Sequence, residues 1–132
     1  MGAWSGEPFG NDSAGDWAWD LKEQTTWDAV RDALAAVVDT DGPVDSDDAT
    51  TAIAAAEVVA HGLGRPTQVD AYTADVAAFA MRAGAPGGDV VELAVRALAE
   101  ATDPEGELAE LWEDDPEEWD AANAKLRAAL EG

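Results

Sequence analysis

Apolar residues recur along this chain at spacings of three and four, the period of an amphipathic α-helix, and no segment alternates as a half-buried strand does. Short breaks rich in Gly, Pro and Asp separate the helical segments. The pattern predicts helices over about 12–24, 27–38, 46–62 and 67–84, with three more starting at Asp89, after Pro104 and after Pro116. No repeat of fixed period is visible, so a solenoid is not expected. We predict an all-α, compact bundle of six or seven helices, formed by residues 1–132 as one domain.

The helical stripes also predict which side chains share the core. Small alanines let helix backbones approach closely, so a few large groups must fill the remaining volume. The predicted large core residues are Trp17, Trp27, Leu34, Ile53, Phe79, Leu98, Leu111, Trp119 and Leu126. The fourth helix is expected to open at the capping pair Thr67 and Asp70 and to bury Val69 and Tyr72. The last helix carries Trp119, Asn123, Leu126 and Leu130 on one stripe.

Several polar residues stand where helices are expected to start or stop. Asn11, Asp12 and Ser13 are residue types that cap a helix N-terminus, and Asp89 is the expected cap of the fifth helix. Gly62 is the expected C-terminal stop of the helix over 46–62.

The first eleven residues form an N-terminal arm before the first helix. The arm is rich in Gly and Pro and carries Trp4 and Phe9. Because large aromatics bury the most area per residue, we expect both to be buried and to fix the arm to the bundle.

The same stretch resembles the opening of the Domain of Unknown Function 4259 family. The resemblance rests on Gly2-Ala3-Trp4, Pro8-Phe9 and Asn11-Asp12-Ser13-Ala14-Gly15-Asp16-Trp17, and it continues more faintly through 52–60, 107–112 and Trp119. The chain departs from the family pattern at Ser5, where Gly is usual, and at Gly15, where a larger apolar residue is usual. The resemblance implies a small helical bacterial domain and supplies no catalytic residues.

The excess of acidic over basic residues limits the kinds of partner that this protein is expected to bind. The chain has 29 acidic and 7 basic residues, a formal net charge of −22. Such a surface repels nucleic acid and anionic membranes and favours cationic partners or high salt. A salt-adapted or high-GC origin would give the same composition. With no cysteine, no basic-apolar leader and no bilayer-length apolar run, a cytoplasmic protein is expected.

One face of the first helix combines carboxylates with an aromatic. Asp12, Asp16, Asp20 and Glu23 follow at three- and four-residue spacing, and Trp19 lies on the same face. Such a ladder can bind a cation or a cationic partner, although a solvated acidic face gives the same pattern. The acidic stretch from Glu105 to Glu118 offers Trp112 as a second anchor, with packing against the bundle as its alternative.

The sequence contains no complete metal-binding or catalytic motif. The acidic loop from Asp39 to Asp48 fails the EF-hand pattern, because Pro43 and Thr50 occupy the fifth and twelfth positions. His61 is the only histidine in the sequence. Glu57 lies one helical turn before it and could polarise it as a base. We expect instead that the two residues form an ion pair on the helix surface. We predict no metal and no cofactor.

Two readings therefore remain. The first is a non-enzymatic acidic interaction domain, an immunity-like or regulatory partner of a basic protein, whose candidate face comprises Asp12, Asp16, Trp19, Asp20, Glu23 and Trp112. The alternative is a small-molecule or metal-binding domain, with a hydrolase as one form of it, that uses the carboxylates of helix 1 or of Asp39–Asp48. The first requires an exposed acidic or apolar patch, and the second a closed pocket with ionisable groups inside.

Overall fold

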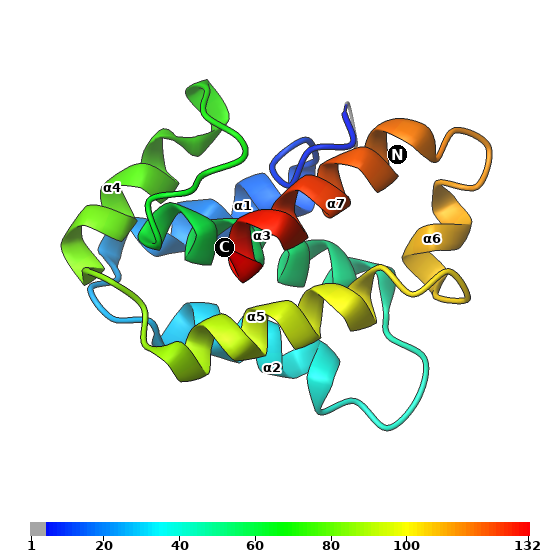
Figure 1. Ribbon diagram of the computed structural model, residues 1–132, viewed down its shortest axis with the longest axis horizontal. Coiled ribbons are helices and arrows are strands. Elements are labelled where there is room, and N and C mark those ends of the chain that lie inside the picture. Colours follow the sequence, from blue (N-terminus) through cyan, green and yellow to red (C-terminus); the bar gives the residue numbers. More distant parts are fainter. Residues whose placement is uncertain (1–4) are drawn as a thin grey trace.

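The computed structural model describes residues 5–132, and its regular elements are all helices (Figure 1). They are α1 (Asp12–Asp20), η1 (Leu21–Glu23), α2 (Asp28–Val38), α3 (Ser46–Gly62), η2 (Ala71–Thr73), α4 (Ala74–Ala83), α5 (Gly88–Ala101), α6 (Glu107–Leu111) and α7 (Glu117–Glu131), where η marks a 3-10 helix. The predicted all-α bundle is confirmed, with seven α-helices in the described range.

The helix α3 lies at the centre of the bundle. It contacts α1, α2, α4, α5, α6 and α7, and every residue from Ala52 to Ala60 is buried. A helix that is apolar on all sides belongs in the interior. In Figure 1, α7 crosses in front of α3, with α6 at one end of the molecule and α4 at the other.

The predicted core is largely correct. Leu34, Ile53, Phe79, Leu98, Trp119 and Leu126 are buried. Trp17 and Trp27 are half-buried and pack against that core, with the Trp27 ring edge-on to Phe79 at 5.1 Å between centroids. Leu111 was expected in the core but is 52% exposed, because α6 is a single short turn that turns only Leu108 inward.

The start of the fourth helix differs from the prediction. Asp70 and Thr73 form a capping box around η2, and α4 begins only at Ala74. Val69 and Tyr72 therefore lie in the preceding loop and turn, and they are 76% and 58% exposed rather than buried.

The other helix termini are partly as predicted. Asn11 caps α1, its Oδ1 accepting the Ala14 backbone N–H at 2.8 Å. Gly87, not Asp89, is the N-cap of α5, so Asp89 lies in the first turn, where the helix dipole favours a carboxylate. Gly106 likewise caps α6, which leaves Pro104 in the turn before it.

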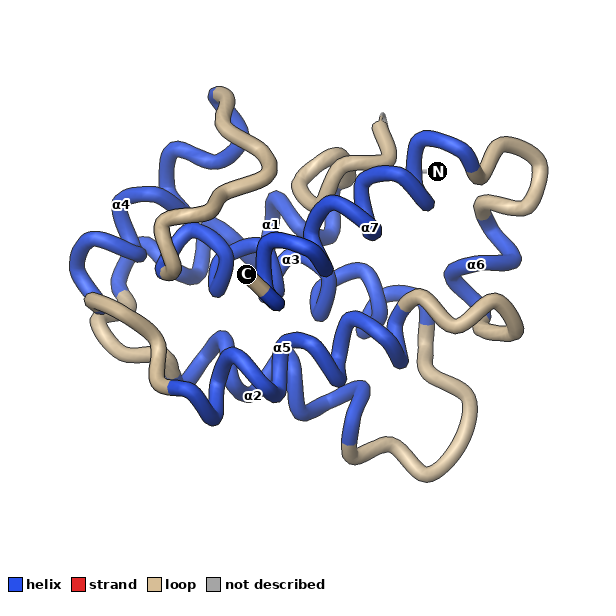
Figure 2. Tube along the Cα trace, in the orientation of Figure 1, coloured by secondary structure: helices blue, strands red, loops and turns tan. Residues whose placement is uncertain are grey.

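The helices are joined by short loops, apart from the α2–α3 and α3–η2 connections (Figure 2). No helix within residues 5–132 is long and apolar enough to cross a membrane.

The described part of the N-terminal arm is fixed at two points. The Gly6 backbone N–H donates to Glu118 Oε1 at 2.6 Å, and the Phe9 backbone N–H donates to Gln68 Oε1 at 2.8 Å. Phe9 is 1% exposed, which confirms its predicted burial. Trp4, the other predicted anchor, lies outside the described residues. The arm from Ser5 to Gly10 thus packs along the bundle and forms one wall of the pocket described next.

Candidate functional site

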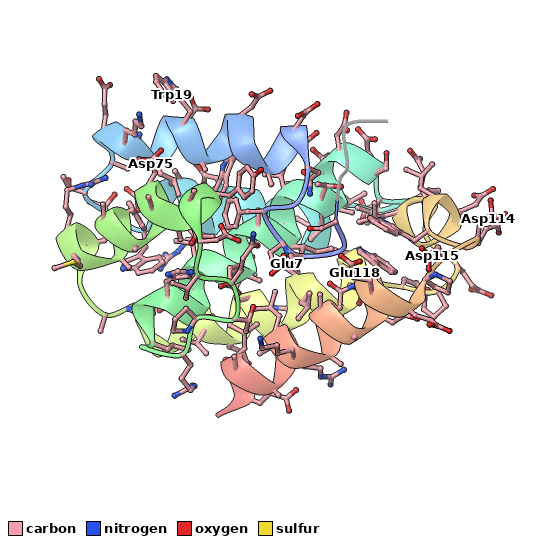
Figure 3. The ribbon with its side chains drawn as sticks, turned by 90° about the horizontal axis from the view of Figure 1, so that it is seen from above. Glu7, Trp19, Asp75, Asp114, Asp115 and Glu118 are labelled. Carbon is pink, nitrogen blue, oxygen red and sulfur yellow. The ribbon has the colours of Figure 1, made fainter. Side chains whose placement is uncertain are left out.

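The predicted interaction residues fall in two places. Asp12 and Trp112 line one pocket at the α6 end of the molecule. Trp19 lies about 10 Å further along the α1 axis, given a rise of about 1.5 Å per residue. Figure 3 shows the Trp19 ring projecting outward from α1, in the same half of the molecule as Asp75 of α4. Asp12 and Trp112 thus share the pocket, whereas Trp19 lies further along α1, outside the pocket lining.

The pocket has a volume of about 120 Å³. Its walls come from the arm, the first turns of α1 and α3, the helix α6 and the start of α7. The lining residues are Ser5, Gly6, Glu7, Pro8, Asn11, Asp12, Ser13, Ser46, Asp47, Thr50, Ile53, Leu108, Leu111, Trp112 and Trp119.

The apolar lining of the pocket centres on two tryptophans. Trp112 stacks on Trp119, with ring centroids 6.3 Å apart and an angle of 6° between the planes. Trp119 is 6% exposed and belongs to the core, whereas Trp112 is half-buried. A rigid core residue thus holds Trp112 in place while part of its ring remains open to the pocket.

Three carboxylates contribute to the same lining. Glu7, Asp12 and Asp47 are exposed side chains from the arm, α1 and α3. None of them forms an ion pair with a basic residue in the described part of the chain. Convergent negative charge beside an aromatic wall suits a cation with an apolar stem.

Close packing of the arm against α7 shapes the pocket. A Cβ atom added to Gly6 would lie 2.6 Å from the Trp119 backbone nitrogen, so only glycine allows this approach. Figure 3 shows Glu7 and Glu118 close together where the arm meets α7. Glu118 Oε1 accepts the Gly6 backbone N–H, and Glu7 is the member of this pair that lines the pocket.

Trp19 forms the second location. Its side chain is 66% exposed, and the Lys22 ammonium lies 3.6 Å from its ring centroid. Lys22 is also 3.9 Å from the Asp75 carboxylate. Asp16, Asp20 and Glu23 around it are exposed.

A buried polar network lies inside the bundle. Glu57 of α3 is 0% exposed, and its Oε2 accepts the backbone N–H groups of Thr67 and Gln68, each at 2.9 Å. Its Oε1 accepts the Thr67 hydroxyl at 2.5 Å. These bonds hold the α3–η2 loop against α3. The sequence signal is a lone carboxylate in the middle of an alanine-rich helix, which sequence reasoning took as a surface residue.

His61 completes this network. Its Nε2 lies 3.1 Å from Glu57 Oε2 and 3.1 Å from the Gln68 carbonyl oxygen. Because both neighbours are acceptors, Nε2 carries the proton. The Glu57–His61 contact exists as predicted, but the expectation of a surface pair is wrong: the two side chains are 0% and 5% exposed. Because Glu57 and His61 both bond to the backbone of Gln68, the pair links α3 to the α3–η2 loop.

The acidic loop between α2 and α3 does not gather its carboxylates. Within residues 5–132, no group of three His, Asp or Glu side chains is placed to hold a metal ion. Asp45 instead caps α3 by accepting the Asp47 backbone N–H at 3.3 Å. The described residues therefore offer no three-ligand metal site in this loop.

Comparison with known families agrees with the N-terminal pattern. The family model described as "Domain of unknown function (DUF4259)" matches residues 2–124, which include α1 to α6 and the first half of α7. The chain belongs to this family. No curated protein and no solved structure matches the chain. Membership of DUF4259 assigns no activity, so function must be argued from the site.

The DUF4259 signature residues in the described range have mainly structural roles. Phe9 fills the core, Asn11 caps α1, and Ala14 packs at 0% exposure against the bundle. Trp17 covers part of the core. The departure at Gly15 is solvent-exposed, with no atom within 4 Å of an added Cβ. Of the signature residues on α1, Asp12 is one that faces the pocket.

Proposed function

We propose that this domain is a non-enzymatic acidic interaction domain that binds a basic partner protein, as immunity-like and regulatory domains do. A cationic side chain of the partner enters the pocket between the arm, α1, α3 and α6. The observation that carries this proposal is the convergence of Glu7, Asp12 and Asp47 on the wall formed by Trp112.

The charge distribution supports a basic partner. Most basic side chains of the domain are already engaged within it. Arg31 and Arg127 pair with Asp89 and Glu131. Arg65, Arg82 and Lys125 donate to backbone carbonyls of Ala129, Leu21 and Thr67. With 29 acidic residues in the chain, the surface keeps a large excess of negative charge. Such a field attracts a basic protein and raises its association rate.

The pocket supports a lysine or arginine side chain in particular. The aliphatic stem of either residue packs on apolar surface while its charged head stays near carboxylates. Leu108 and the Trp112 ring supply that surface. A cation over an aromatic face contributes about 0.5–2 kcal/mol, depending on how far it is desolvated.

The test uses two capped tripeptides, acetyl-Gly-Arg-Gly-amide and acetyl-Gly-Glu-Gly-amide. We expect the arginine peptide to shift the Trp112 indole N–H resonance saturably, more weakly at high salt, and the glutamate peptide to leave it unchanged. The double variant Asp12→Asn/Asp47→Asn should lose the shift.

A matched control separates the pocket from long-range attraction. Asp28→Asn/Asp32→Asn removes the same two charges from the exposed side of α2. This control should bind like the unmodified protein. Equal losses in both double variants, or no saturable shift with the arginine peptide, would show that the pocket is not the binding site.

A further inference from the structure

The loop between α2 and α3 contains the one Asp–Gly pair of the sequence. Asp41 and Gly42 lie between Asp39, the C-cap of α2, and Asp45, the N-cap of α3, and the sequence has no Asn–Gly pair. Figure 2 shows this connection as a long loop that projects from the helices. Because glycine has no Cβ atom, its backbone nitrogen can approach the preceding side chain with little steric hindrance. An Asp–Gly pair is therefore prone to a reaction between its own two residues.

The structure leaves both reacting groups of this pair unconstrained. Asp41 and Gly42 are exposed, and a Cβ atom added to Gly42 would meet no atom within 4 Å. Within residues 5–132, neither the Asp41 carboxylate nor the Gly42 N–H has a hydrogen-bond or ion-pair partner. Segments with few contacts and a solvated backbone open at low cost in free energy. The Gly42 nitrogen can thus reach Asp41 Cγ without breaking a contact of the fold.

The fold holds the two Asp–Ser pairs, whose small second residue also offers little hindrance. Asp12-Ser13 lies inside α1, where the helical backbone is fixed. Asp45-Ser46 begins α3: the Asp45 carboxylate accepts a backbone N–H of the first turn at 3.3 Å, and the Ser46 N–H donates to Glu107 Oε1 at 3.3 Å. Ring closure at either pair would disrupt a helix start. Both pairs therefore serve as internal controls for the loop pair.

We propose that Asp41-Gly42 is a site of isoaspartate formation. The Gly42 nitrogen bonds to Asp41 Cγ, and its proton leaves with one carboxylate oxygen and a solvent proton as water, which closes a five-membered succinimide. Water then breaks one of the two C–N bonds of the ring and returns the solvent proton. Cleavage at the main-chain carbonyl of Asp41 gives isoaspartate with a free α-carboxylate, and cleavage at Cγ restores aspartate. One water is released and one is consumed, without oxidation or reduction.

The product is a substrate for a carboxyl methyltransferase. Such an enzyme transfers the methyl group of S-adenosylmethionine to the new α-carboxylate, which leaves S-adenosylhomocysteine and removes one negative charge. Because the rearrangement adds one methylene to the main chain of an exposed loop, α2 and α3 keep their hydrogen bonds. Asp41 does not line the acidic pocket, so this site is independent of the basic partner proposed above.

The test ages the folded protein for several weeks at neutral pH and physiological temperature. The endoproteinase Asp-N cleaves before aspartate but not before isoaspartate, so mass spectrometry of its peptides reports each aspartate separately. We expect progressive loss of cleavage before Asp41, while cleavage before Asp12 and Asp45 stays complete. A protein isoaspartyl methyltransferase with labelled S-adenosylmethionine should place its label on the peptide that contains Asp41.

Two variants test the assignment. Asp41→Glu keeps the charge but would need a six-membered ring, and Gly42→Ala adds a Cβ atom beside the attacking nitrogen in open space. Both variants should melt like the unmodified protein. We expect no conversion at position 41 in Asp41→Glu and at least about tenfold slower conversion in Gly42→Ala, because a Cβ atom restricts the backbone. Asp32→Glu, at an exposed position of α2, is the matched control and should convert like the unmodified protein.

Ageing in urea separates the effect of the fold from that of the dipeptide. In the unfolded chain, Asp12 and Asp45 should also convert, whereas Asp41 should convert within about threefold of its rate in the folded protein, because the loop is already open. No conversion at Asp41 in the folded protein overturns the proposal, whatever occurs in urea. Equal conversion at all three positions in the folded protein, or an unchanged rate in Gly42→Ala, also overturns it.

Discussion

Glu57 and Gln68 are linked by a hydrogen bond of 2.9 Å, from the Gln68 backbone N–H to Glu57 Oε2, inside the bundle. The Gln68 side chain in turn accepts the Phe9 backbone N–H at 2.8 Å and donates to Asp70 Oδ2 at 3.0 Å. One carboxylate on the central helix therefore positions both the loop before η2 and the N-terminal arm. This chain of bonds connects α3 to the arm, which is one wall of the acidic pocket lined by Glu7, Asp12 and Asp47.

We predict that Glu57→Gln lowers the free energy of unfolding by about 1–3 kcal/mol, because the charge-assisted bonds that Glu57 accepts from two backbone N–H groups are weakened. Urea unfolding measures the loss, and hydrogen exchange at the Phe9, Thr67 and Gln68 amides should speed up. The exposed Glu92→Gln on α5 is the control and should stay within about 0.5 kcal/mol. Equal stability of the two variants would contradict a structural role for Glu57.

Phe9 anchors the arm, and its truncation gives a second prediction. Phe9→Ala should lower the free energy of unfolding by about 3–5 kcal/mol, the usual loss for a fully buried phenylalanine. Val69→Ala, at a side chain that is 76% exposed, is the control. The sequence predicts a similar loss for Trp4→Ala, provided that Trp4 is buried. A Trp4→Ala protein that melts like the unmodified one would show that Trp4 does not help to fix the arm.

Two glycines should respond in opposite directions to alanine. Gly6→Ala places a Cβ atom 2.6 Å from the Trp119 backbone nitrogen, and backbone cannot move aside cheaply. We expect a loss of about 1–3 kcal/mol from this overpacking. Gly15→Ala lies on the open side of α1 and should gain about 0.5–1 kcal/mol through helix propensity. Thermal melts of both variants decide the matter; a stable Gly6→Ala would mean that the arm can lift from α7.

Local sequence signals predicted most of the fold correctly. Apolar spacing located the helices, and Asn11 was recognised as the cap of α1, because both depend on residues within one or two turns. Val69, Tyr72 and Leu111 were misplaced for a related reason. Their spacing fits a helical stripe, but Val69 precedes the N-cap Asp70, Tyr72 lies in the 3-10 turn η2 and not in α4, and Leu111 is the last residue of the short α6.

The sites were harder to predict because they depend on distant contacts. Asp12 and Trp112 share a pocket although they are far apart in the sequence. Glu57 looked like a surface residue because its partners, Thr67 and Gln68, lie in a loop whose path the sequence does not specify. The helical spacing of Asn123 placed it on the correct stripe, but the lack of a hydrogen-bond partner for its buried amide depends on packing against other helices, which the sequence does not specify.

Folding of this domain should not depend on metal. Within residues 5–132, the carboxylates form no three-residue cluster suited to a metal ion, and His61 is engaged by Glu57 and the Gln68 carbonyl. We expect thermal melts with and without EDTA to coincide. A melting temperature several degrees lower in EDTA would contradict this and would direct attention back to the loop from Asp39 to Asp48.

Trp19 provides the last prediction, since it tests whether α1 takes part in binding outside the pocket. The side chain is 66% exposed and is covered on one face by Lys22. Trp19→Ala should therefore change the free energy of unfolding by at most about 1 kcal/mol, the value of an exposed cation–π contact. If a basic partner docks along the acidic face of α1, the same variant should weaken binding, because large exposed aromatics carry much of the energy of interfaces.

The experiment measures association of an identified partner at two salt concentrations, with Trp19→Ala and with Met81→Ala as the matched control. Met81 is an exposed apolar side chain on α4, at 87% exposure, so its removal tests loss of apolar surface in general. Salt should slow association of all three proteins, because screening weakens steering by the acidic surface. Trp19→Ala should differ from Met81→Ala in the dissociation rate. An acidic partner, or an association rate that does not change with salt, would contradict the prediction that the acidic surface attracts the partner. Equal dissociation rates for Trp19→Ala and Met81→Ala would mean that recognition is confined to the acidic pocket.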